Sequence, residues 1–70
     1  MTPEDLRDNY RYVLTTAEGL SVLDDLKIRF HVNTSTFSED PYETAFREGQ
    51  RTVVLFIENM MREQIEPNEP

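Results

Sequence analysis

Hydrophobic residues recur at helical spacing in three stretches of the chain, with polar and cap-forming residues between them. The first stretch has four apolar residues three or four positions apart: Leu6, Tyr10, Val13 and Leu14. This spacing predicts an α-helix over about residues 3–14, with one apolar face. Thr2 is suited to its N-cap and Pro3 to its first helical position.

The second stretch begins immediately after the first. Thr15 lies three residues before Glu18, which is the capping-box pattern, and a helix over about residues 16–31 is predicted. Its apolar residues occupy more than one face, as in a helix covered on two sides: Leu20, Val22, Leu23, Leu26, Ile28 and Phe30. Because almost no linker remains between the two helices, we expect a tight corner or a hairpin.

A third and longer helix is predicted after a polar loop at about residues 33–39, in which Phe37 is expected to fold back over the core. Asp40 and Pro41 supply its cap and first residue, and Glu43 would complete a second capping box. Its core stripe is expected to be Tyr42, Ala45, Phe46, Gly49, Val53, Phe56, Ile57 and Met60. Glycine weakens a helix, so Gly49 on this stripe predicts close approach by a neighbouring helix.

A second apolar ridge, formed by Val54, Met61 and Ile65, runs beside the distal half of that stripe. Two short helices are hardly enough to cover both flanks, so the ridge is a candidate partner-binding surface. The alternative is that the helix over 3–14 covers it. Arg47 and Arg51 lie within reach of acidic residues on the polar side of the same helix, which predicts surface ion pairs, with partner binding as the alternative.

These patterns predict an all-α fold in which two short helices pack on one long C-terminal helix. A single domain is expected over residues 1–65, followed by a frayed acidic tail at 66–70. The predicted core comprises Tyr10, Val13, Leu14, Leu23, Leu26, Phe30, Phe46, Gly49, Val53, Phe56 and Ile57.

The charge of the chain limits its partners. It has 14 acidic and 7 basic side chains in 70 residues, a formal net charge of −7, which repels phosphate and argues against direct binding to nucleic acid. No apolar run is long enough to span a bilayer, so no membrane partner is expected and a soluble intracellular protein is the interpretation. Without cysteine, stability must come from helix packing or from association with another chain.

Candidate chemistry is sparse. His31 is the only histidine, and no second group in the sequence converges on it; near a helix C-terminus it is better explained by the helix dipole. Asp24-Asp25 and Glu39-Asp40 lack the alternating spacing of a calcium loop and are explained by capping and solvation. We therefore expect a protein without enzymatic activity, cofactor or metal.

The run Thr15-Thr-Ala-Glu-Gly, then Val22-Leu23, and then Asp40-Pro-Tyr-Glu-Thr-Ala-Phe-Arg-Glu-Gly-Gln-Arg51 resembles a family of small tailed-bacteriophage proteins typified by a protein of a Bordetella podophage. The resemblance covers about residues 6–61 and is most specific over 44–49. It implies a helical phage or prophage product, often encoded among genes for virion structure and DNA packaging, with no established enzymatic activity. The chain departs from the family pattern at Ala17, where proline is expected.

Two functional hypotheses follow. The first is a phage protein that acts through protein–protein contacts in virion structure or assembly, with a phage structural protein or a second copy as partner. The second is an acidic inhibitor that binds a host protein and presents carboxylates where DNA phosphates would sit. The expected location is the virion or the host cytoplasm.

Overall fold

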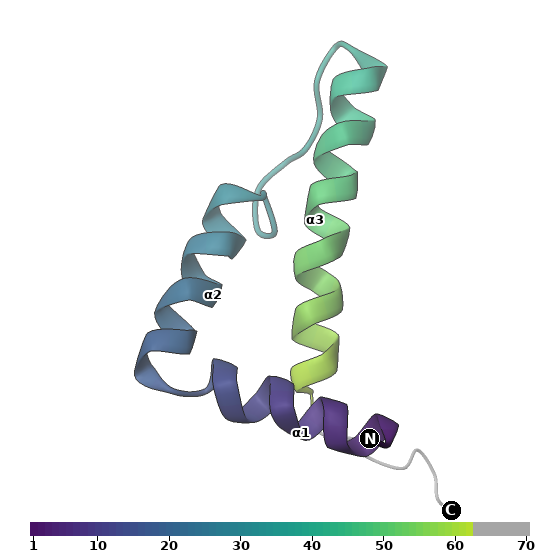
Figure 1. The fold of residues 1–70 in the computed structure, drawn as a ribbon. Helices are drawn as coiled ribbons and strands as arrows, with labels where there is room; N and C mark the ends of the chain where they lie inside the picture. The colour runs from purple at the N-terminus through teal and green to yellow at the C-terminus, as the bar shows by residue number, and fades with distance from the viewer. Residues whose placement is uncertain (63–70) are drawn as a thin grey trace, which may run out of the picture.

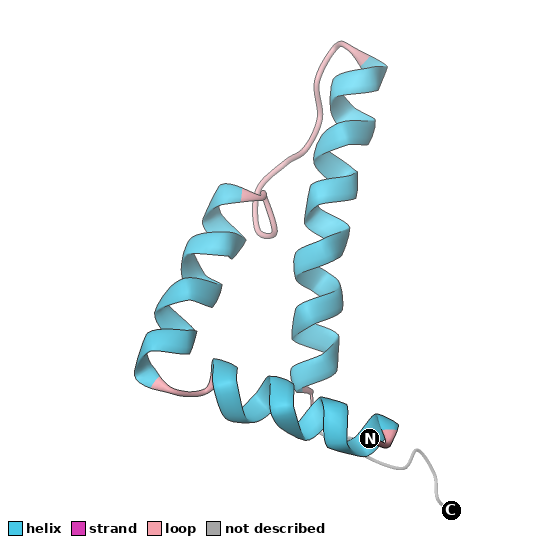
Figure 2. Cartoon of the chain, viewed as in Figure 1, coloured by secondary structure: helices cyan, strands magenta, loops and turns pink. Residues whose placement is uncertain are grey.

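In the computed structural model of the chain, residues 1–62 are described, and three α-helices make up their regular structure (Figures 1 and 2). These are α1 (Pro3–Leu14), α2 (Ala17–Arg29) and α3 (Pro41–Met61). The predicted all-α class, with two short helices packed on a longer third one, is confirmed. Ile65 and the predicted tail at 66–70 lie outside the described residues.

The three helices form an open triangle (Figure 1). Helix α1 lies across the C-terminal end of α3, where the rings of Tyr10 and Phe56 pack edge to face at a centroid distance of 6.2 Å. Arg7 donates to the carbonyl of Asn59 at 3.0 Å, and Arg11 donates to that of Arg62 at 3.2 Å. Since α3 has no basic residue in its own last turn, α1 supplies the cations that its terminal carbonyls attract.

The corner between α1 and α2 is held by Thr16. Its hydroxyl accepts from the N–H of Gly19 at 2.9 Å and donates to the carbonyl of Val13 at 2.9 Å. The predicted capping box of Thr15 with Glu18 is wrong, because Thr15 ends α1 and its hydroxyl bonds the carbonyl of Arg11. A Cβ on Gly19 would collide with the Val13 carbonyl oxygen and lie 2.7 Å from Leu14 Cα. The corner is therefore tight enough to require glycine.

Helix α2 ends in a left-handed turn. His31 has a φ of 66°, and the N–H of Val32 bonds the carbonyl of Lys27 at 3.0 Å, which is the outer bond of a Schellman motif. The turn directs Val32 into the core. His31 therefore has the expected structural role, and it fills this role through its backbone conformation.

The core lies between α2 and the distal half of α3. Leu23, Val32 and Val54 are buried together, and Leu26, Phe30, Ile57 and Met61 pack around them half-buried. Lys27 of α2 and Glu58 of α3 form an ion pair at 3.0 Å beside this cluster. The predicted core positions Leu23, Leu26, Phe30 and Ile57 are confirmed.

Other predicted core positions are wrong. Val13, Phe46, Gly49, Val53 and Phe56 are exposed. For the four residues of α3 the reason is the rotation of this helix about its own axis: the ridge of Val54, about 100° around the helix from the predicted stripe, faces α2 instead. No neighbouring helix approaches Gly49, since nothing lies within 4 Å of the position a Cβ would occupy.

The segment between α2 and α3 returns along the N-terminal turns of α3 (Figure 1). The hydroxyl of buried Thr36 donates to the carboxylate of Glu48, and Ser38 exchanges hydrogen bonds with the Thr44 hydroxyl at 2.9 and 3.1 Å. Phe37, predicted to cover the core, is exposed instead. The segment is attached to α3 by polar groups rather than by an apolar anchor.

At the start of α3, the Asp40 carboxylate accepts from the N–H of Tyr42 at 3.0 Å. The predicted cap is confirmed. Glu43, expected to complete a capping box, instead holds the side chain of Arg47. The first turn of α3 thus has one capping side chain, with Pro41 at its first position.

Candidate interaction surface

The ridge predicted to bind a partner is turned inward in the structure. Val54 is only 2% exposed and packs against α2, and Met61 is half-buried at the edge of the same cluster. Ile65 lies outside the described residues. The expectation that Val54 belongs to an exposed apolar ridge is therefore wrong, because α2 covers it.

The two arginines predicted on the polar face of α3 donate hydrogen bonds to the backbone of the segment between α2 and α3. Arg47 pairs with Glu43 at 3.0 Å and donates to the carbonyl of Phe37 at 3.5 Å. Arg51 pairs with Glu48 at 3.6 Å and donates to the carbonyl of Val32 at 3.4 Å. The predicted ion pairs are present, and both guanidinium groups also bond the chain's own backbone.

The largest uncovered apolar feature of α3 is made of five residues of the stripe that was predicted to be core; two other members of that stripe, Ile57 and Met60, are half-buried and buried as predicted. We call it the exposed stripe: Tyr42, Phe46, Gly49, Val53 and Phe56. Tyr42 is 86% exposed, Phe46 62%, Val53 60% and Phe56 52%. Only its last residue, Phe56, is partly covered, by Tyr10 of α1. The space in front of Gly49 is open.

No charged residue interrupts this face. At 100° per residue, the charged side chains of α3 fall in one arc of roughly 140°, opposite the exposed stripe. They are Glu43, Arg47, Glu48, Arg51 and Glu58. In a chain of net charge −7, an uncharged face of this length stands apart from the rest of the surface.

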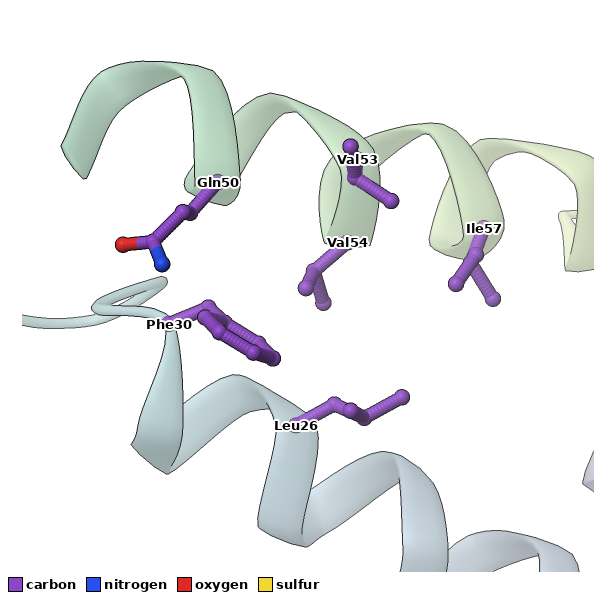
Figure 3. A pocket seen from close by; sticks show the side chains of 6 residues that line it. All are labelled: Leu26, Phe30, Gln50, Val53, Val54 and Ile57. Atoms are coloured by element: carbon purple, nitrogen blue, oxygen red, sulfur yellow. The ribbon is translucent and has the colours of Figure 1, made fainter. Parts of the chain in front are cut away.

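An apolar pocket of about 190 Å³ lies between α2 and α3, next to the exposed stripe (Figure 3). It is lined by Leu26, Phe30, Gln50, Val53, Val54 and Ile57. Val53 belongs to both features, so the stripe continues into an incompletely filled part of the core. The lining offers neither a nucleophile nor a titratable group, and apart from Gln50 its residues are apolar.

Among the acidic residues considered as chemical candidates, Asp25 is paired with a basic neighbour and Asp40 caps α3. Asp25 accepts two hydrogen bonds from Arg29 at 3.1 and 3.2 Å, which raise the pKa of that guanidinium. Asp8 pairs with Arg11. Within residues 1–62 no cluster of histidine and carboxylate side chains could hold a metal ion. The same part of the chain has no helix with the length and apolarity that a bilayer crossing requires.

The spacing of the exposed stripe was visible in the sequence, but its surroundings were not. Its positions follow one helical face, which made burial the expected outcome. What the spacing could not show is that α2 and the segment after it pack on the neighbouring face instead.

The comparison with protein families agrees with the resemblance seen in the α1–α2 corner and α3. The profile of the family described as Bbp19-like phage protein matches residues 10–68, which is most of the chain. No curated protein and no solved structure matches the chain significantly. The chain belongs to the family of Bbp19-like phage proteins.

Proposed function

We propose that this phage protein has no enzymatic activity and acts in virion structure or assembly by binding another protein through the exposed stripe of α3. The observation that carries the proposal is a line of four large apolar side chains left in solvent on an uncharged helix face. Contiguous apolar patches are uncommon on soluble monomers and mark interaction surfaces.

The energetics support the same surface. Burying one large apolar side chain contributes about 1.5–3 kcal/mol, so covering most of the stripe would contribute several kcal/mol to association. Tyr and Phe are also the side chains that recur at the energetic centres of interfaces. The segment between α2 and α3 runs beside the first turns of α3 (Figure 2), and Tyr42 and Phe46 in those turns stay exposed and accessible to a partner helix.

The proposal can be tested with phage that carry Phe46→Glu. Because Phe46 is already exposed, the variant should fold, while its charge would have to be desolvated in an apolar interface. Mass spectrometry of purified virions should find the wild-type protein at the copy number of a structural component and the variant strongly depleted. Ile28→Glu is the control: Ile28 is an apolar residue on α2 that is even more exposed than Phe46, and its replacement should leave incorporation unchanged.

If both variants are incorporated like the wild type, the exposed stripe is not the binding surface. Virions that lack the protein while infected-cell lysate contains it would remove the structural role and favour an assembly factor or the acidic host-directed inhibitor. The net charge of −7 motivates that inhibitor, but the pairing of Asp8, Asp25, Glu43, Glu48 and Glu58 with basic side chains weighs against a continuous phosphate-like surface.

A further inference from the structure

The exposed stripe has the spacing of a coiled-coil seam. Its members follow one another at intervals of four, three, four and three residues: Tyr42, Phe46, Gly49, Val53 and Phe56. This is the alternation of a and d positions in a heptad repeat, in which each side chain inserts between residues of a facing helix. The stripe is therefore shaped to receive another α-helix rather than a small molecule or an extended strand.

The residues that flank the seam indicate which helix it receives. In coiled coils, charges at the e and g positions select the partner. Here those positions hold Glu43, Gln50 and Ile57 on one side and Ala45, Thr52 and Asn59 on the other. The single charge among them, on Glu43, is already paired with Arg47. A partner with charged flanks would find nothing to pair with, whereas a second copy brings equally neutral flanks.

The sizes of the side chains along the seam favour an antiparallel arrangement of two copies. Open space lies in front of Gly49, and three residues before it stands the exposed ring of Phe46. With the helices antiparallel, Phe46 of each copy fills the space over Gly49 of the other, and Tyr42 of each meets Val53 of the other. A parallel pair would instead oppose glycine to glycine and leave a void.

The position of α1 selects the same arrangement. Helix α1 covers the seam at Phe56, close to the C-terminal end of α3. In the antiparallel register the partner's α3 starts opposite Val54 and stops short of α1. In a parallel pair both copies of α1 would lie at the same end of the seam and compete for the same space.

We propose that the exposed stripe binds the same stripe of a second copy of this chain, in an antiparallel α3–α3 dimer related by a two-fold axis. The inference rests on the proposed function only in taking the stripe as the contact surface. Covering Tyr42, Phe46 and Val53 on both copies would bury on the order of 1,000 Å², near the lower limit for a specific interface. The dimer is accordingly reversible.

Because the chain has no cysteine, disulfide trapping can test the register directly. Tyr42→Cys and Val53→Cys proteins are prepared separately, mixed, and oxidised, with each protein alone as control. In the proposed register positions 42 and 53 face each other across the interface, while two copies of position 42, or of position 53, lie about 16 Å apart along the helix axis. The mixture should form crosslinked heterodimers, and neither protein alone should crosslink efficiently.

Crosslinking of each protein with itself would indicate a parallel pair and overturn the arrangement. Sedimentation equilibrium provides the second measurement: wild type should dimerise reversibly, while Gly49→Leu, which fills the space needed by the partner's Phe46, should be monomeric with unchanged helicity. A wild-type chain that stays monomeric at millimolar concentration overturns the dimer. If Phe46→Glu is nevertheless lost from virions, the proposed function stands with a different partner.

Discussion

The two glycines of this chain have opposite surroundings. Gly19 is buried in the corner where α2 leaves α1, and the backbone of Val13 and Leu14 occupies the space its side chain would need. Gly49 faces open solvent in the middle of the exposed stripe. Sequence alone favoured Gly49 as the close-packing glycine because it lies on an apolar stripe, but the close approach occurs at Gly19.

This contrast makes a paired prediction at the level of single residues. Gly19→Ala forces the corner apart against backbone atoms and should destabilise the chain by at least about 2 kcal/mol, the usual cost of overpacking. Gly49→Ala adds helix propensity without a clash and should stabilise the monomer by up to about 1 kcal/mol. Urea denaturation at low protein concentration measures both. A tolerated alanine at position 19 would contradict the tight corner.

At the level of the element, α3 shows what its sequence could and could not specify. Its start follows from the cap-forming residues Asp40 and Pro41, so it was predictable. Its rotation was not, since the stripe and the ridge of Val54 are both apolar. The observed rotation brings Val54 against α2 and is accompanied by polar contacts of the segment after α2, such as Arg51 with the Val32 carbonyl, which no periodicity reveals.

Adjacent valines on α3 test this rotation. Val54 is buried in the core and Val53 is largely exposed. Val54→Ala should cost about 2 kcal/mol through lost burial and a residual cavity, whereas Val53→Ala should change monomer stability by less than about 0.5 kcal/mol. Chemical denaturation of the two variants against wild type is sufficient. Equal costs, or a reversed order, would place α3 in the rotation predicted from the stripe.

At the scale of the whole molecule, the described residues 1–62 bury little apolar surface for their number. Their buried apolar side chains are Leu23, Val32, Val54 and Met60, and an unfilled pocket remains between α2 and α3. Small domains bury a smaller fraction of their surface than large ones, so stability here is modest without a partner. The candidate surface was within reach of sequence reasoning as a set of residues, but only the assembled triangle shows that these residues are uncovered.

Association should therefore contribute measurably to stability. If the exposed stripe is covered by a second copy, the melting temperature of wild type should rise with protein concentration, because binding to the folded state alone shifts the equilibrium by mass action. Phe46→Glu should melt at a temperature independent of concentration. Circular dichroism melts over a hundredfold concentration range would reveal the difference. The same dependence of melting temperature on concentration in both proteins would mean that the stripe contributes nothing to stability.

The contacts of α1 with the C-terminal end of α3 have a consequence for folding during synthesis. Arg7 bonds the carbonyl of Asn59 across a sequence separation of 52 residues. During translation α1 is synthesised several seconds before those carbonyls at ordinary elongation rates. Until then the apolar face of α1 has no partner surface to pack against. The nascent chain, rather than the finished protein, is therefore the form most exposed to chaperones and proteases.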